Sequence, residues 1–316
     1  MPKNQQKPEE HICSSCTKPA VTYIRYSGAH LCANHFSEFL KTRVKREMRK
    51  QGKLPPDSRL AVALSGGKDS LTLLHLMVEM FANHKDLELV ALSVDEGIEP
   101  YRTDSLAIAS RWCKKLGVEH RVISFKKKFG YTLDEIARAD IPDLLPCSYC
   151  GVFRRSCLNV LSREISATKL ATGHNLDDNS QSILMNICKG DFNKLFRLGP
   201  HRIIKEGLIP RIMPLRVIPE KEIYLHTILN HIDAYTGECP YAQFAQRGLY
   251  RKILNQLEDQ QPGTRHAIIN IYDHLFDNIE ANIKTGPMNT CSTCGEPSSG
   301  LLCKACEMQK IIESAI

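Results

Sequence analysis

The stretch from Ser65 to Ser70, with the sequence Ser-Gly-Gly-Lys-Asp-Ser, constrains the fold of this chain more than any other feature. It follows the apolar run 60–64, which is short and unbroken, as a buried parallel strand is. It precedes residues 71–81, which are long enough for a helix and contain few helix breakers. The sequence therefore indicates a strand, a glycine turn and a helix, in that order.

The residue types in this turn suit phosphate binding. Glycines let the backbone approach a ligand closely, and the free N–H groups at a helix start point toward an anion. Adjacent glycines and an aspartate after the lysine differ from the Walker spacing. A tight turn without a ligand is the alternative, which the flanking strand and helix disfavour. The expected phosphate-binding residues are Ser65, Gly66, Gly67, Lys68, Asp69 and Ser70.

Strand and helix patterns alternate after this turn. We expect a strand over 87–94, a helix over 101–116 and a strand over 119–125. Such alternation predicts an α/β fold with a doubly wound parallel sheet, whose ligands bind beyond the carboxyl ends of the strands. Asp95 lies at that edge, beside the glycine turn. A short strand that starts at Lys169 leads to Gly173 at the same edge.

Two adjacent carboxylates, Asp177 and Asp178, follow Gly173 at a predicted helix start. Either one can act as a helix N-cap. Together, beside a phosphate loop, they could instead hold the Mg²⁺ that accompanies a bound phosphate. The sequence leaves both interpretations open.

Thirteen cysteines in 316 residues are many, and an odd number indicates metal ligands or reactive thiols rather than a disulfide framework. Pairs spaced C-x2-C or C-x2-H occur near both ends of the chain, and four such ligands close a tetrahedral zinc site. We expect two Zn²⁺ ions, in modules stabilised by the metal. The first would be bound by Cys13, Cys16, Cys32 and His35, and the second by Cys291, Cys294, Cys303 and Cys306.

A third pair, Cys147 and Cys150, has no second pair close to it in the sequence. It stands directly before a predicted helix over 152–167 that carries Arg154, so we expect lowered thiol pKa values. Cys239 is a lone cysteine in a later loop. These three thiols could ligate a [4Fe-4S] cluster and leave its fourth iron without a protein ligand. Redox nucleophiles are the alternative.

The composition allows a nucleic-acid partner without requiring one. The formal net charge is +7, which permits binding to a polyanion. Basic residues concentrate in the predicted helix 36–53 and at 126–128, where they either form a solvated face or contact phosphates. The sequence has no stretch of about 18 apolar residues and no apolar signal core. We expect a soluble, cytoplasmic protein.

The glycine turn resembles the loop of the PP-loop ATP pyrophosphatases. The whole ordered set of motifs, from Cys13 to Cys306, resembles the archaeal and eukaryotic tRNA 2-thiouridine synthetases of the cytosolic thiolation protein family. The resemblance implies that ATP binds at 65–70, with Asp95 and Gly173 in its site, and adenylates the C2 carbonyl of a tRNA uridine. It further implies a cluster on Cys147, Cys150 and Cys239.

The same resemblance implies a functional acid at Asp178 and a role for Arg154, a position where some relatives have lysine. It implies a homodimer, and sulfide or a ubiquitin-like thiocarboxylate carrier as the sulfur donor. Thiolation at U54 is associated in this family with thermophily, and 24% charged residues favour wobble uridine U34 instead. A cysteine persulfide without a cluster, and a zinc-ribbon RNA-binding scaffold without activity, are the alternatives.

Six segments are expected along the chain. They are a disordered tail (1–10), an N-terminal zinc module (11–36), a basic helix with a linker (37–58), the catalytic PP-loop domain (59–260), a helical extension (261–287) and a C-terminal zinc ribbon (288–316).

Overall fold

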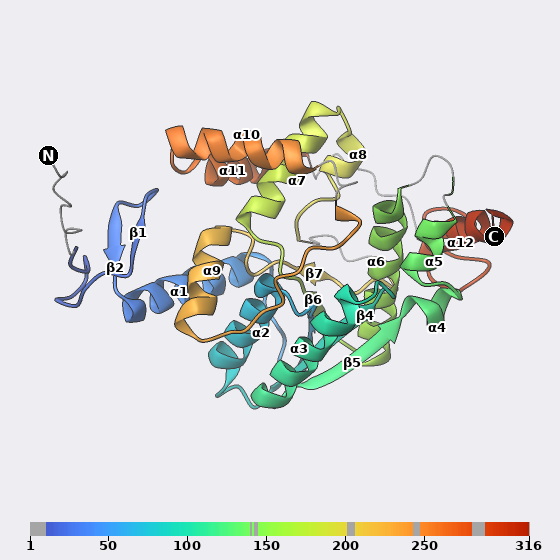
Figure 1. Cartoon of the computed structure of the whole chain (residues 1–316), viewed down its shortest axis with the longest axis horizontal. Helices are drawn as coiled ribbons and strands as arrows, with labels where there is room; N and C mark the ends of the chain where they lie inside the picture. The colour runs from blue at the N-terminus through green and yellow to red at the C-terminus, as the bar shows by residue number, and fades with distance from the viewer. Residues whose placement is uncertain are drawn as a thin grey trace, which may run out of the picture.

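The computed structural model describes residues 11–139, 141, 145–200, 206–242, 247–279 and 288–315. Its centre is a parallel sheet of five strands in the order β5-β4-β3-β6-β7 (Figure 1). Leu60 pairs with Leu89 of β4 on one side and with Lys169 of β6 on the other. The predicted parallel α/β fold is confirmed. The strands are β3 (Ser58–Ala63), β4 (Leu87–Asp95), β5 (Glu119–Ser124), β6 (Lys169–Ala171) and β7 (Arg211–Ile212).

The side chains of β3 alternate between two cores because successive residues of a strand point to opposite faces. Leu60 and Val62 pack with apolar residues of the helices α1, α2 and α3. Ala61 packs on the other face, with Leu161 of α6. Helices therefore cover both faces of the sheet. They are α1 (Ala33–Lys50), α2 (Lys68–Phe81), α3 (Tyr101–Leu116), α4 (Phe125–Phe129), α5 (Leu133–Arg138) and α6 (Pro146–Glu164).

The second half of the chain adds helices beside the sheet, and α10 and α11 lie along α7 (Figure 1). The expected break near residue 262 separates α10 from α11. These helices are α7 (Leu176–Cys188), α8 (Phe192–Leu195), α9 (Glu220–Leu229), α10 (Arg247–Gln260), α11 (Thr264–Ile279) and α12 (Lys304–Ala315).

Two small cysteine-containing modules lie at opposite ends of the long axis of the molecule (Figure 1). The N-terminal one contains the hairpin of β1 (Thr22–Ile24) and β2 (Ala29–Leu31). The C-terminal one contains β8 (Asn289–Thr290), β9 (Pro297–Ser298) and α12, which packs on α6. The sheet edge that carries the glycine turn lies between them.

One residue of the basic helix near the N-terminus differs from both expectations, whereas Lys45, Arg46, Arg49 and Lys50 are exposed, as a solvated face requires. Arg43 of α1 is buried and pairs with the buried Glu222 at 2.6 Å. The hydroxyl of Tyr26 donates to the same carboxylate. A charge inside a protein needs such a partner because burial removes its hydration. This basic residue therefore fastens the N-terminal module to α9 rather than facing solvent or phosphate.

Two further boundaries differ from the sequence prediction. Helix α6 begins at Pro146, so Cys147 and Cys150 lie in its first two turns and not before it. The lysines 126–128 belong to the short helix α4 and not to a loop. None of the described helices is long and apolar enough to cross a membrane.

Candidate functional site

The glycine turn connects β3 to α2 and requires glycine at one position. Gly66 has φ +88°, a conformation that other residues rarely adopt. A Cβ at this position would lie 2.1 Å from the carbonyl oxygen of Ser105 on α3. The Gly66 carbonyl also accepts a hydrogen bond from the N–H of Tyr235 at 2.9 Å. The turn is thus packed between α3 and the loop that follows α9.

The hydroxyl groups of two serines bridge the turn at the start of α2. The N–H of Ser65 donates to Oγ of Ser70 at 3.1 Å, and the two serine Oγ atoms lie 3.1 Å apart. The N-cap of α2 is Gly67, which offers no side chain to satisfy the first N–H groups of the helix. These donors, together with the helix dipole, make the turn a site for an anion.

Charged side chains meet beside this helix start. Lys68 Nζ lies 2.6 Å from Glu220 Oε1 and 2.9 Å from Asp69 Oδ2. Although desolvation opposes its charge, these two carboxylates raise the pKa of Lys68, which stays cationic. Asp69 also accepts from Asn175 Nδ2 at 2.9 Å. Burial raises the pKa of Asp69 in spite of these partners.

Gly173 brings a second loop against the turn. A Cβ on this residue would lie 3.2 Å from the backbone carbon of Asp69 and from the backbone nitrogen of Ser70. Such a contact is tighter than ordinary packing allows, so glycine permits the close approach. The two loops that were expected at one sheet edge therefore touch.

A cavity of about 800 Å³ opens beside the turn. Its walls come from Ser65, Lys68 and Asp69 on one side and from α9 and the loop after it on the other. Tyr101, Tyr224 and Tyr235 contribute aromatic surface, and the rings of Tyr101 and Tyr235 meet edge to face at 5.4 Å between centroids. The volume suits a nucleotide, with a polar end at the turn and an apolar wall opposite.

The three acidic residues expected at this edge have different partners. The Asp95 carboxylate accepts from the N–H of Gly97 at 2.9 Å, so it orders its own turn. Asp177 accepts from the N–H of Glu220 at 2.8 Å and pairs with Arg265 at 3.1 Å. Its carboxylate thus joins α7, α9 and α11.

Asp178 helps to cap α7, and its carboxylate lies 3.8 Å from the guanidinium of Arg247. It forms a capping box with Asn175, whose side chain accepts from the Asp178 N–H at 2.9 Å. Its charge also contributes to the raised pKa of Asp69, so the two carboxylates lie near each other. Each of these two carboxylates has a basic partner, Lys68 for Asp69 and Arg247 for Asp178.

The central cysteines have raised rather than lowered thiol pKa values, and our expectation for Cys147 and Cys150 was wrong. Burial, and the charge of the neighbouring Cys239, raise the pKa of Cys147. Burial also raises the pKa of Cys150, although the charge of Arg154 opposes it. For these thiols, desolvation, which raises the pKa, outweighs the helix N-terminus, which lowers it.

These three thiols gather at one side of α6. Cys150 belongs to the apolar core there, and Cys239 packs against that core. Cys147 Sγ lies 3.4 Å from the carbonyl oxygen of Tyr241, which joins α6 to the loop after Cys239. Arg154 Nη2 donates to Cys150 Sγ at 2.9 Å. The structure therefore brings together the cysteine pair, the lone cysteine and Arg154.

The spacing of these sulfurs differs from that of a site for a single ion. In the described part of the chain, three groups of residues hold all their ligand atoms within 4.8 Å of one another, and the central trio is not among them. Ligands of one cluster bind different irons, so their sulfurs stand farther apart than those around one ion. The open arrangement fits a [4Fe-4S] cluster better than zinc.

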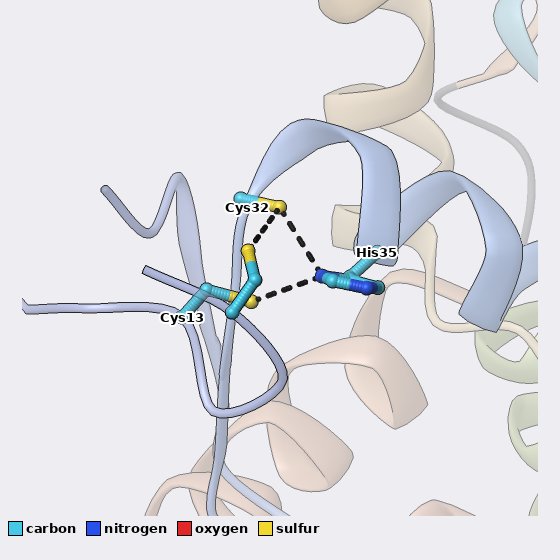
Figure 2. Close-up of side chains that lie close together, drawn as sticks. Cys13, Cys32 and His35 are labelled. Atoms are coloured by element: carbon cyan, nitrogen blue, oxygen red, sulfur yellow. Dashed lines mark hydrogen bonds between the residues drawn. The ribbon is translucent and has the colours of Figure 1, made fainter. Parts of the chain in front are cut away.

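The N-terminal ligand group is closed (Figure 2). Cys13 Sγ and Cys32 Sγ lie 3.3 and 3.5 Å from Nδ1 of His35, and Cys16 Sγ lies 3.8 Å from Cys32 Sγ. Although burial opposes its ionisation, the backbone N–H groups of Cys32 and Ser15 lower the pKa of Cys13 to about 6. A thiolate is the form that binds a metal.

The C-terminal ligand group has the same character. Cys291, Cys294, Cys303 and Cys306 place their sulfurs within 4.8 Å of one another. The Cys303 N–H donates to Cys291 Sγ at 3.2 Å, and this bond is the leading cause that lowers the pKa of Cys291 to about 6. Both quartets predicted from spacing are thus assembled in space.

Several side chains at the site carry no sequence signal that we used. Glu220 holds Lys68, Tyr101 lines the cavity, and Glu96 and Arg102 lie between the glycine turn and Arg154. The sequence Asp-Glu-Gly at the end of β4 was one usable signal, because it marks the carboxyl edge of the sheet. The remaining group of possible metal ligands, formed by His75, Glu79 and His226, was also not foreseen.

Comparison with known proteins agrees with this geometry. The PP-loop domain family matches residues 40–225, and the N-terminal LIM domain of 2-thiouridine synthetase TtuA matches residues 12–37. The tRNA 2-thiolation protein NcsA of Haloferax volcanii is 36% identical, over 96% of this chain and 99% of that protein. This chain belongs to the PP-loop family of tRNA 2-thiolation proteins.

Two other members of the family match over most of their length. Cytoplasmic tRNA 2-thiolation protein 1 of Xenopus laevis is 34% identical, over 93% of this chain and 86% of that protein. The structure of the U34-tRNA thiolase NcsA from Methanococcus maripaludis, solved with its [4Fe-4S] cluster, matches with a TM-score of 0.84. The two chains are 35% identical, and the match covers 95% of each.

Proposed function

We propose that this chain is an ATP-dependent tRNA thiolase that converts wobble uridine U34 to 2-thiouridine with the help of a [4Fe-4S] cluster. One observation carries the proposal: three cysteines in an open arrangement lie at the same sheet edge as the phosphate-binding turn. The resemblance to a U34-tRNA thiolase over 95% of both chains supports it.

The first step activates the base. The C2 oxygen of uridine attacks the α-phosphorus of ATP, the bond between the α and β phosphates breaks, and pyrophosphate leaves. The N–H groups at the start of α2 and the ammonium of Lys68 hold the phosphates. Asp69 and Asp178 would hold Mg²⁺, which would offset the charge that develops on the leaving group. Ser65 to Ser70 and Gly173 form the ATP site in this proposal.

The second step replaces oxygen with sulfur. Sulfide attacks C2, the bond from C2 to the adenylated oxygen breaks, and AMP leaves with that oxygen. One uridine, ATP and sulfide thus give 2-thiouridine, AMP and pyrophosphate, without a change of oxidation state. A bound cluster, held by Cys147, Cys150 and Cys239, offers an iron that lacks a protein ligand and can bind soft sulfide.

Arg154 lies where it can steady the reacting groups. Its guanidinium donates to Cys150 Sγ and contacts the carboxylate of Glu96. Although desolvation opposes its charge, Glu96 and Cys150 raise its pKa, so it stays cationic. An arginine here can stabilise an oxyanion or phosphate but cannot act as a proton donor or acceptor near neutral pH.

The two terminal quartets bind zinc in this proposal. With a bond from zinc to sulfur of about 2.3 Å, a tetrahedral site places its sulfurs about 3.8 Å apart. The sulfurs of Cys16 and Cys32 lie 3.8 Å apart, and those of Cys294 and Cys303 lie 3.6 Å apart. Residues 11–36 and 288–316 form the two zinc modules, on either side of the basic helix and linker (37–58), the catalytic domain (59–260) and the helical extension (261–287).

Positive charge near the site suits an RNA partner. Within the described residues, Arg155 and Arg211 have no acidic partner. Burial lowers the pKa of both guanidinium groups, and the charge of Arg155 adds to the effect on Arg211. Unpaired guanidinium groups are phosphate ligands. We further propose that the enzyme acts in the cytoplasm as a homodimer, and that sulfide or a ubiquitin-like thiocarboxylate carrier supplies the sulfur.

Nucleoside mass spectrometry of tRNA from a deletion strain tests the proposal. We expect 2-thiouridine to disappear from position 34, and to return with the wild-type gene. Loss of 2-thiouridine from position 54 instead would show that U54, and not U34, is the target. An unchanged nucleoside profile would favour a scaffold. A chain that is active after anaerobic purification without iron would favour a persulfide on cysteine.

A further inference from the structure

A single buried carboxylate lies between the phosphate-binding turn and the central cysteines. Glu96 follows directly after β4 and is 4% exposed. Its Oε2 lies 2.7 Å from Nε of Arg102, and its Oε1 lies 2.9 Å from Nε of Arg154. Within the described ranges, Glu96 is the only acid that pairs with either arginine.

Arg102 connects Glu96 to the turn. It is 3% exposed, and its Nη1 donates to the carbonyl oxygen of Ser65 at 2.8 Å. Its Nε also donates to the carbonyl of Val94 at 2.6 Å, and its Nη1 lies 3.1 Å from Oγ of Ser105. A guanidinium buried this deeply needs a carboxylate, because a lone buried charge is strongly destabilising.

Arg154 connects Glu96 to the cysteines. Its side chain is 51% exposed, so it could extend into solvent at little cost. Instead one nitrogen contacts Glu96 while another donates to Cys150 Sγ at 2.9 Å. The fork of a guanidinium can hold two partners in one fixed geometry. The contact with Glu96 therefore fixes the position of the Arg154 side chain.

We propose that Glu96 is the positioning residue of the thiolation site: it fixes Arg154 on Cys150 and ties that pair, through Arg102, to the turn that binds ATP. This inference rests on the proposed function. Residues that orient a metal ligand from outside its first shell tune the metal and the reaction, and hydrogen bonds to cysteine sulfurs tune iron–sulfur clusters. The carboxylate itself touches neither substrate nor cluster.

Glu96→Gln keeps the shape of the side chain and removes its charge. We expect kcat for thiolation to fall about 10–100-fold, as for other supporting residues of metal sites, while the KM for ATP changes by less than about threefold. The KM is preserved because Val94 and Ser105 still hold Arg102 against the turn. The matched control is Glu99→Gln, an exposed residue of the same loop, which should behave as the wild type.

A double-mutant cycle with Arg154→Met tests whether Glu96 acts through Arg154. If it does, Glu96→Gln causes no further loss of kcat in the Arg154→Met background. Losses that multiply would overturn the inference. Visible circular dichroism of the reconstituted cluster gives a second readout, in which Glu96→Gln should shift the spectrum toward that of Arg154→Met. A wild-type spectrum in Glu96→Gln would also overturn it.

Glu96→Asp covers the case in which the glutamine variant does not fold. It keeps the charge that buried Arg102 needs, but it is one methylene too short to reach both guanidinium groups. We expect the same spectral shift with a smaller loss of kcat, and wild-type values for both would contradict the inference. Wild-type protein that binds no iron would instead refute the proposed function, so the two failures are distinguishable.

Discussion

The terminal cysteine groups and the central one differ in how complete they are. At both ends of the molecule, four ligands already face one another within 4.8 Å. In the centre, Cys147 contacts a backbone carbonyl and Cys150 contacts an arginine. A closed quartet of ligands leaves no coordination position for a reactant, whereas a trio of ligands would leave one.

Backbone hydrogen bonds to sulfur distinguish two terminal thiols, Cys13 and Cys291, from the central ones. Backbone N–H groups lower the pKa of Cys13 and Cys291 to about 6. Burial raises the pKa of Cys147 and Cys150. Burial also raises the pKa of Cys294 and Cys306 in the C-terminal quartet, so the lowered values belong to particular thiols and not to whole quartets. Burial thus favours the protonated form of Cys147 and Cys150 in the metal-free protein.

Removal of Cys239 should have the largest effect on activity. We expect Cys239→Ala to reduce thiolation by at least about 10³-fold, the scale reached when an essential group of an active site is removed. Zinc content and thermal stability should stay close to those of the wild type, because this half-buried side chain closes no terminal quartet. Activity within about tenfold of the wild type would break the distinction between the central and terminal groups.

Removal of a terminal ligand should act on structure first. Cys303→Ser should release one zinc ion and loosen residues 288–315. Helix α6 would then lose its contacts with α12, with a fall of roughly tenfold in kcat because support for the cluster ligands is weakened. Metal analysis, hydrogen exchange and a kinetic assay measure these changes. The control is Cys188→Ser, which alters an exposed cysteine outside the quartets.

The pH dependence of thiol alkylation sharpens the comparison further. In metal-free protein, reaction of Cys13 with iodoacetamide should rise with a midpoint near pH 6, against an ordinary value of 9.0. The midpoint for Cys147 should lie above 9.0. Because the folded pKa of Cys13 is depressed, its thiolate stabilises the module fully above about pH 9, and this contribution is lost as the pH falls through about 6. Equal midpoints for the two thiols would contradict this account.

Asp95→Asn should have the smallest effect. Its carboxylate accepts from the N–H of Gly97 and not from the phosphate-binding turn. We expect a loss of about 1 kcal/mol in the free energy of unfolding, the usual worth of one hydrogen bond, with the KM for ATP changed by less than about twofold. A tenfold rise in that KM would instead place Asp95 in the ATP site, as the sequence first indicated.

Prediction from the sequence succeeded best for sites whose residues lie close together along the chain. The ligand pairs at Cys13 and Cys291 are recognisable because zinc requires short, regular spacings. Gly66 was recognisable because the turn requires a conformation open to glycine. Both predictions depend on a few consecutive residues.

Features that depend on tertiary contacts were not predictable in the same way. The raised thiol pKa of Cys147 comes from burial and from Cys239, which is distant in the sequence. Glu96 and Glu220 act through arginine and lysine side chains of other elements. Burial of Arg43 likewise depends on Glu222 of α9. No spacing rule relates such residues, because folding alone brings them together.

A reconstituted reaction tests the central claim most directly. Purified protein with its cluster, unmodified tRNA, ATP and sulfide are combined without oxygen, and the nucleosides and nucleotides are quantified. Our account predicts 2-thiouridine at position 34, with one AMP and one pyrophosphate released for each thiolated base, and no product with Cys239→Ala. Full thiolation by that variant, or thiolation without AMP, would contradict it.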